Sequence, residues 1–123
     1  MPRFSYDDQM TTEQPGQSCA AALRTAVEAL GATVESTLDT DTEAKMGAQG
    51  FRILGGILSS EDKLPVHIHG HVEDTGAERV IYLQVAENMG MGSMLGMEKK
   101  YRQHCQDLLG RLKSQLAEQL DAT

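Results

Sequence analysis

The side chains best suited to chemistry in this sequence are three histidines that alternate with other residues in one short segment. They are His67, His69 and His71, in the stretch VHIHGHVED. In an extended strand alternate side chains share a face, so the three imidazoles are expected on the same side, with neighbours about 6.6 Å apart. Two imidazoles at this spacing can converge on a zinc or copper ion, since neutral imidazole binds both. The segment therefore predicts a possible metal site on one face of a strand.

The third histidine does not complete such a site. In a strand the α-carbons of His67 and His71 lie about 13 Å apart, too far for all three imidazoles to surround one tetrahedral zinc ion. A metal site would use two of the three histidines and take a further ligand from elsewhere. Glu73, Glu78 or the histidines of a second copy of the chain are the candidate sources.

The histidine face also has two other interpretations. It is either an ordinary solvated sheet surface or a surface that contacts a ligand or a second subunit. Val80 and Tyr82 are expected on the same face as the histidines. An aromatic and a branched side chain among imidazoles form a surface suited to contact, an observation that favours the ligand or subunit contact.

A segment rich in glycine and methionine, NMGMGSMLGM at residues 88–97, follows the last predicted strand. Its glycines do not mark a dinucleotide site, because a Rossmann unit needs another parallel strand and an acidic residue about 20 positions further on. Its thioethers could bind Cu(I), or its flexible methionines could fill irregular space and adapt to a ligand. Together with the apolar segment 51–58 it is expected to form a mobile mouth over an apolar cavity. Met89, Met91 and Met94 therefore join the candidate ligand residues.

No pairing of a nucleophile with a base is recognisable. Cys105 and His104 are neighbours, but on a helix adjacent side chains diverge by about 100° and do not face each other. Asp39 and Asp41 fall in a predicted turn and are expected to be solvated. The sequence thus favours a protein without catalytic activity. A small enzyme with a histidine base is the remaining alternative, since imidazole titrates near neutrality.

Length and charge limit the classes of function. The chain has 123 residues, about one domain's worth, and a formal net charge of −7, which repels nucleic acid. Its longest uninterrupted apolar stretch is ILGGIL at 53–58, far short of the roughly 20 residues of a membrane-spanning helix. No export signal is recognisable, so we expect a cytoplasmic protein with reduced thiols at Cys19 and Cys105.

Hydrophobic periodicity predicts a strand, a helix and two more strands in the first half of the chain. Apolar residues at every second position over 4–10 predict a strand, interrupted at Asp8. Apolar residues at helical spacing from 18 to 30 predict a helix, with Ser18 as its N-cap and Gly31 just after its end. The elements predicted next are a strand over 32–38 with Val34 and Leu38 on one side, a turn at 39–41, and a strand over 42–49 with Ala44, Met46 and Ala48 on one side.

The second half of the chain predicts a hairpin and a long helix. The hairpin joins 64–73 to 78–87, and placing Glu73 opposite Glu78 makes one face uniformly apolar. In that register His67 lies opposite Gln84, His69 opposite Tyr82, and His71 opposite Val80. The helix is predicted over 94–120 from an apolar stripe at intervals of three and four residues. The members of the stripe are Tyr101, Cys105, Leu108, Leu109, Leu112, Leu116 and Leu120.

The resulting order, β-α-β-β-β-β-α, predicts a single α+β domain of two layers, with both helices on the apolar face of an antiparallel sheet of about five strands. This topology is similar to small helix-grip (START-like) folds, in which a curved sheet wraps a C-terminal helix, and topology alone implies nothing about catalysis. We expect a non-catalytic binding or assembly domain. It would either hold a small apolar ligand between the sheet and the final helix or form a homodimer through the histidine face. The alternative is a metal-binding protein that uses the His67-x-His69-x-His71 strand.

Overall fold

The part of the protein that the structure describes forms one antiparallel sheet and two helices. The computed structural model describes residues 4–38, 40–47, 64–88 and 98–121. Its elements are β1 (Ser5–Thr12), α1 (Gly16–Ala29), β2 (Thr33–Thr37), β3 (Asp41–Met46), β4 (Val66–Asp74), β5 (Arg79–Glu87) and α2 (Glu98–Asp121). The five strands lie in the spatial order β1-β5-β4-β3-β2, and every neighbouring pair is antiparallel. The predicted element order and the α+β class are confirmed.

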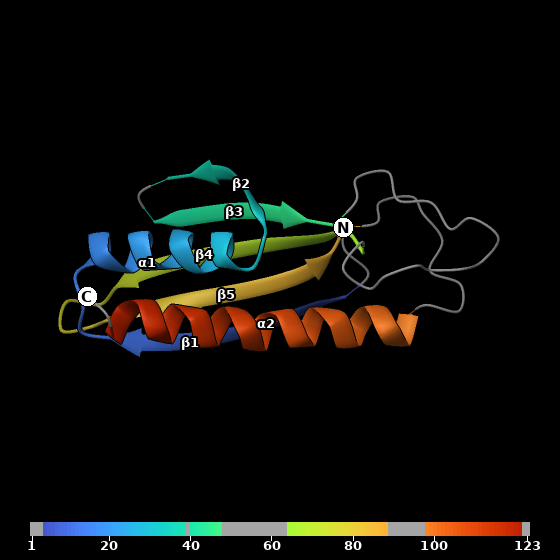
Figure 1. Ribbon diagram of the computed structural model, residues 1–123. Helices are drawn as coiled ribbons and strands as arrows, with labels where there is room; N and C mark the ends of the chain where they lie inside the picture. Colours follow the sequence, from blue (N-terminus) through green and yellow to red (C-terminus); the bar gives the residue numbers. More distant parts are fainter. Residues whose placement is uncertain (1–3, 39, 48–63, 89–97, 122–123) are drawn as a thin grey trace.

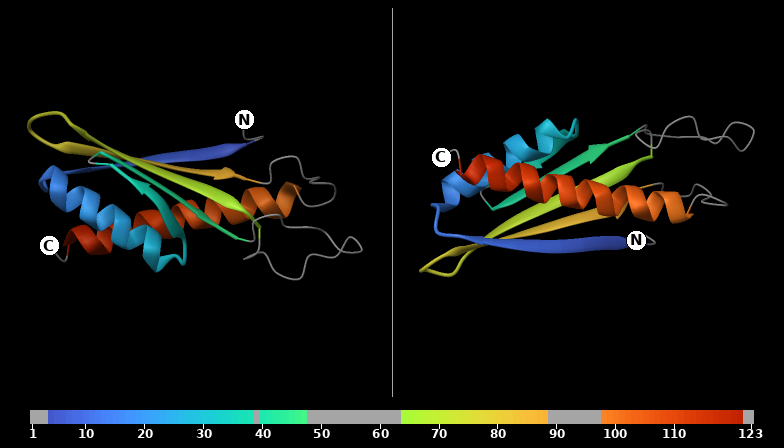
Figure 2. Two further views of the ribbon diagram at one scale, coloured as in Figure 1. Left: turned by 90° about the horizontal axis from the view of Figure 1, so that it is seen from above. Right: turned by 60° about the horizontal axis from the view of Figure 1, so that its bottom comes forward.

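Both helices lie on the same face of the sheet, as the views in Figures 1 and 2 show. The longer helix, α2, contacts β5 and β1, whereas α1 contacts β4, β3 and β2, and the helices also contact each other. The opposite face is called the outer face below. Its side chains are exposed or half-buried: Asp7, Gln9, Asp41, Glu43, His67, His69, His71, Tyr82 and Gln84.

The apolar core fills the layer between the sheet and the helices. In β4 and β5 every second residue points into it, because side chains alternate across a strand. The predicted stripe of α2 closes the core from the other side and is buried except for Leu109, which is half-buried. The inward-facing residues of β4 and β5, at every second position, therefore pack against the apolar stripe of α2, whose members recur every three or four residues.

The structure corrects two details of the first two strands. The strand β1 runs without interruption through Asp8, whose Oδ2 lies 3.1 Å from Nζ of Lys113 on α2, so a carboxylate on the helix-facing side is paired with a cation. Val34 and Leu38 do not share a side, since the register of β2 with β3 shifts between Val34 and Ser36 and reverses the alternation. Leu38 is consequently 66% exposed.

The bounds of other elements also differ from the prediction. The first helix begins at Gly16, with Pro15 rather than Ser18 as its N-cap. Ala44 is buried and Met46 half-buried on the core side of β3, as predicted, whereas Ala48 lies outside the described residues. The predicted start of the last helix, at 94–97, lies outside them too.

The hairpin of β4 and β5 has the predicted faces but a register shifted by two residues. Glu73 lies opposite Val80 rather than Glu78. The histidines therefore lie opposite other partners than predicted: His67 opposite Ala86, His69 opposite Gln84, and His71 opposite Tyr82. A shift by two leaves every side chain on its face, because the side-chain period of a strand is two.

Candidate functional site

The three histidines lie on the outer face, along the middle of the sheet. Their strand, β4, pairs with β3, which places Asp41 opposite His71 and Glu43 opposite His69. The side chains of His67, His69 and His71 are 33%, 34% and 39% exposed. Each imidazole is therefore packed against its neighbours and still reachable from solvent.

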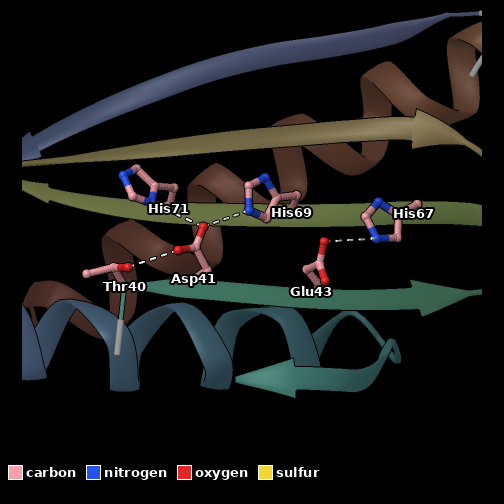
Figure 3. Close-up of polar contacts among 6 residues, drawn as sticks. All are labelled: Thr40, Asp41, Glu43, His67, His69 and His71. Atoms are coloured by element: carbon pink, nitrogen blue, oxygen red, sulfur yellow. Dashed lines mark hydrogen bonds and ion pairs between the residues drawn. The ribbon is translucent and has the colours of Figure 1, made fainter. Parts of the chain in front are cut away.

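Asp41 joins two of these histidines, as Figure 3 shows. Its Oδ1 lies 2.9 Å from Nε2 of His69 and 3.1 Å from Nδ1 of His71. Its Oδ2 accepts a hydrogen bond of 2.9 Å from the hydroxyl of Thr40. The hydrogen bonds, first from His69 and then from Thr40, hold the pKa of Asp41 below its usual value. Because an ionised carboxylate only accepts hydrogen bonds, both imidazoles donate to it.

The predicted environment of Asp41 was wrong. It is not a solvated turn residue but the first residue of β3, and its side chain is 33% exposed. No local sequence pattern marks its role, because only the pairing of β3 with β4 places Asp41 beside the histidine strand. Asp39, its predicted companion, lies outside the described residues.

His67 is not part of this cluster. Its Nε2 lies 3.9 Å from Oε1 of Glu43, beyond hydrogen-bonding distance. Figure 3 shows this pair at a distance along β4 from the group formed by Asp41, His69 and His71. The structure therefore brings together two of the three predicted histidines and adds a carboxylate that the sequence did not single out.

An aromatic ring borders the cluster on the side of β5. The ring of Tyr82 stacks on His71, with centroids 6.2 Å apart and an angle of 25° between the planes, and it is 39% exposed. Val80 lies one alternate position further along β5 and is half-buried. Glu73, a candidate metal ligand in the sequence, interacts with Tyr82 instead and raises the pKa of its phenol by a hydrogen bond.

A shallow pocket of about 590 Å³ opens beside the cluster, over β1 and β5. Its lining residues are Asp7, Asp8, Gln9, His69, His71, Tyr82, Leu83 and Gln84. Two aspartates, two glutamine amides and the stacked His71–Tyr82 pair surround it. A molecule bound there would meet carboxylates and aromatic rings together.

The interior holds a second group of polar side chains, which the sequence analysis did not identify. Glu87, at the end of β5, and His104, on α2, are each 6% exposed within the otherwise apolar layer. Burial, together with the charge of Glu87, raises the pKa of the nearby Cys105 thiol to about 12. Glu87 continues the inward alternation of Leu83 and Val85, so its position was readable from the strand pattern.

Further polar contacts tie the two strands to α2 at this end of the interior. The hydroxyl of Tyr101 donates a hydrogen bond to the carbonyl of Pro65 and accepts one of 3.2 Å from the backbone N–H of Asn88. The ring of Phe4 packs edge-on against Tyr101, with centroids 5.4 Å apart. The start of β4, the end of β5 and the first turns of α2 therefore meet around polar groups.

The predicted ligand residues also include three methionines. Met89, Met91 and Met94 lie outside the described residues, so their role as ligand residues stays a prediction. Within 4–38, 40–47, 64–88 and 98–121, no group of three or more histidine, cysteine, aspartate or glutamate side chains is arranged so that it could hold a metal ion. Of the helices in this part of the chain, none combines the length and hydrophobicity needed to cross a membrane.

Comparison with known proteins identifies the fold. No protein-family model matches the chain, and no curated protein matches it. Solved structures do match it along nearly its whole length. Protein MLL2253 from Mesorhizobium loti aligns with a TM-score of 0.64 and 9% identity, covering 98% of each chain. Ara h 8.0201 aligns with a TM-score of 0.58 and 12% identity, covering 96% of this chain and 98% of its own.

A third structure, TTHA0849 from Thermus thermophilus, aligns with a TM-score of 0.50 and 11% identity, covering 97% of this chain and 98% of its own. At such identities the likeness concerns the fold alone. The predicted helix-grip topology, with a five-stranded antiparallel sheet around a C-terminal helix, is confirmed.

Proposed function

We propose that the protein is a non-catalytic ligand-binding domain that holds a small, largely apolar ligand between its sheet and α2. The observation that carries the proposal is the burial of Glu87 and His104 in the apolar layer, each with 6% of its surface exposed. A carboxylate and an imidazole are polar groups that apolar packing between a sheet and a helix does not require. Such groups are usual where a mostly apolar site fixes the orientation of a ligand through a few polar contacts.

The position of these residues supports the same site. Glu87 is the last residue of β5, and His104 lies in the second turn of α2. The end of β3, the start of β4, the end of β5 and the start of α2 all lie at this end of the sheet (Figure 1). A ligand inserted here would place its apolar part along the core and its polar group against Glu87 and His104. The helix-grip fold supplies the two layers between which it would lie.

The test uses untagged full-length protein and two amphipathic probes of equal chain length, dodecanoic acid and dodecylamine. Native mass spectrometry is expected to show one bound probe molecule per chain. In solution, the same probe is expected to displace the fluorescent dye 1-anilinonaphthalene-8-sulfonate from the protein. Replacing Glu87 by Leu should weaken binding of the preferred probe by about tenfold, the loss of roughly 1.4 kcal/mol of polar recognition. The matched control is Tyr82→Leu on the outer face, which should bind as the wild type does.

Two outcomes would overturn the proposal. One is that neither probe binds at micromolar concentration to folded wild-type protein. The other is that Tyr82→Leu abolishes binding while Glu87→Leu preserves it, which would place the ligand on the outer face. Circular dichroism of both variants shows whether each is folded.

Pairing of two copies through the histidine face is a prediction that the same mass spectra would test. The outer face carries Asp7, Asp41 and Glu43 among its histidines. A symmetric pair would bring carboxylates of one copy close to those of the other, and like charges in an interface oppose association. For this reason we favour the ligand over the homodimer.

A further inference from the structure

We propose that the pocket on the outer face, beside His69 and His71, binds a small planar organic cation of the amidinium or guanidinium class. The pocket has a volume of about 590 Å³, within the range of roughly 300 to 1,000 Å³ that ligand sites occupy. Its lining residues come from three neighbouring strands, β1, β5 and β4. Glu87 and His104, at the interior site proposed above, do not line it, so the two sites are separate.

The charges around the pocket favour a cation. Its lining, as far as the structure describes it, contains two aspartates and no lysine or arginine. The carboxylate of Asp8 is already paired with Nζ of Lys113, at 3.1 Å. Asp7, in contrast, is exposed, and within the described residues it takes part in no ion pair. The net charge of −7 attracts cations to the chain, and the carboxylate of Asp7 would repel an anion from this pocket.

The hydrogen bonds of Asp41 determine which nitrogens of the two histidines remain for a ligand. Nε2 of His69 and Nδ1 of His71 donate to its Oδ1, at 2.9 Å and 3.1 Å (Figure 3). In a neutral imidazole the other nitrogen is an acceptor, so Nδ1 of His69 and Nε2 of His71 can each accept a hydrogen bond. The carboxylate of Asp7 likewise only accepts. A ligand that donates several hydrogen bonds therefore matches this lining better than a ligand that accepts them.

The ring of Tyr82 favours a planar cation over a compact one. His71 stacks on this ring from the side of β4, with centroids 6.2 Å apart, and Gln9 is the partner of Tyr82 on the side of β1. The ring face toward β1 is therefore the one left for a ligand, and Gln9 lines the pocket there. A cation placed on an aromatic face is attracted by its π electrons. The N–H groups at the edge of a planar amidinium or guanidinium also suit a carboxylate.

Glu43 provides a matched control for Asp7 on the same face. It lies opposite His69 on β3, its side chain is 50% exposed, and it is not among the residues that line the pocket. Asp7→Asn and Glu43→Gln each remove one negative charge from the outer face. If the overall charge alone attracted the cation, the two changes would weaken binding equally. If the pocket binds the cation, only Asp7→Asn weakens binding.

The experiment compares three probes of the same shape, benzamidine, benzamide and benzoate, on untagged full-length protein. Titration followed by the NMR shifts of the backbone amides measures each affinity and locates the bound probe. We expect benzamidine to bind with a Kd below about 1 mM, benzamide to bind at least about tenfold more weakly, and benzoate not to bind. The shifts with benzamidine should be largest around Gln9 on β1 and Gln84 on β5, which line the pocket.

Variants test the two groups that attract the cation. Asp7→Asn and Tyr82→Leu should each lower the affinity for benzamidine at least about threefold, through loss of the carboxylate and of the aromatic face respectively. Glu43→Gln should leave this affinity unchanged. Glu87→Leu, which tests the interior site, should leave it unchanged too. Circular dichroism of each variant shows whether it is folded.

Four results would overturn the inference. Failure of wild-type protein to bind benzamidine at millimolar concentration would show that the pocket holds no such cation. Equal affinities for benzamidine and benzamide would show that it does not select charge. Equal losses for Asp7→Asn and Glu43→Gln would show attraction by the overall charge alone. Loss of benzamidine binding in folded Glu87→Leu, with binding kept in Asp7→Asn, would place the probe in the interior. Binding of the dodecyl probes between the sheet and α2 is measured separately, so either proposal can fail without the other.

Discussion

Among single residues, Asp41 has the largest influence on the outer face. One carboxylate receives hydrogen bonds from Thr40, His69 and His71, so it fixes the orientation of two imidazoles and connects β3 to β4 through side chains as well as through the backbone. The hydrogen bonds from His69 and Thr40 lower the pKa of Asp41 and so favour its ionised form. These contacts hold the two imidazoles in one arrangement on the outer face.

Asp41 should therefore contribute to the acid dependence of stability. Because its pKa is lower in the folded chain than in the unfolded chain, ionised Asp41 stabilises the fold at neutral pH, and this contribution is lost as the pH falls through the folded pKa. Asp41→Asn is expected to lower the free energy of unfolding by about 1 kcal/mol at neutral pH, a value limited by solvent screening.

Urea unfolding at a series of pH values measures this effect. The difference between wild type and Asp41→Asn should persist down to about pH 4 and shrink below it. A difference that stays constant down to about pH 2 would mean that the loss comes from packing rather than from the charge of Asp41.

The sequence could predict the histidines of this site but not their partner. A period of two places His67, His69 and His71 on one face without any knowledge of the fold. Asp41 lies 30 residues before His71, in a stretch whose composition also fits a turn, and only the pairing of β3 with β4 brings the two together. Contacts between distant residues depend on strand order and register, which a local pattern does not contain.

On the scale of elements, the packing of α1 on β4 depends on Gly70. This residue points toward the core between His69 and His71, and a methyl group built on it would lie 2.9 Å from Cδ1 and 3.0 Å from Cγ of Leu23, and closer still to Cδ2. Leu23 is completely buried and has little room to move. Gly70→Ala is therefore expected to lower the free energy of unfolding by about 1 to 3 kcal/mol, the usual cost of overpacking.

Thermal or urea unfolding measures the stability of Gly70→Ala, and a second glycine in a different environment provides the control. Gly110 lies on the exposed side of α2 with open space around its α-carbon, so Gly110→Ala should raise stability by up to about 1 kcal/mol through helix propensity. Combining Gly70→Ala with Leu23→Ala should cost less than the sum of the two changes, since the smaller side chain makes room. If Gly70→Ala proved as harmless as Gly110→Ala, the close contact of α1 with β4 would be refuted.

The elements also show where prediction from periodicity ends. Element types, their order and their inward faces followed from apolar spacing, because burial on one side leaves a period in the sequence. The register of the hairpin did not follow, since a shift of two residues leaves the alternation unchanged and the turn decides between the two pairings. The bulge in β2 that exposes Leu38 was likewise invisible, because one additional residue in a short strand leaves no apolar signal.

In the whole molecule, two buried thiols mark opposite ends of the interior. Cys19 lies in the first turns of α1, and its pKa is raised by burial, with smaller effects of Arg79 and Asp74 at the hairpin end of the sheet. Cys105 directly follows His104 on α2 and is influenced by Glu87 at the other end. Figure 1 shows these two ends far apart along the sheet. Both side chains are completely buried, so each reacts only after its surroundings open.

The two thiols can therefore report where the interior opens, a prediction that rests on the proposed ligand site beside Glu87. Entry of a ligand at that end requires local opening, which takes less free energy than global unfolding. In single-cysteine variants, Cys19→Ala and Cys105→Ala, the remaining Cys105 should react with a thiol reagent faster than the remaining Cys19. The preferred amphipathic probe should then slow Cys105 alone. If both thiols react at the same rate and the probe lowers both rates equally, the interior opens only when the whole domain unfolds. That result would contradict the prediction that a ligand enters and leaves through the end beside Glu87.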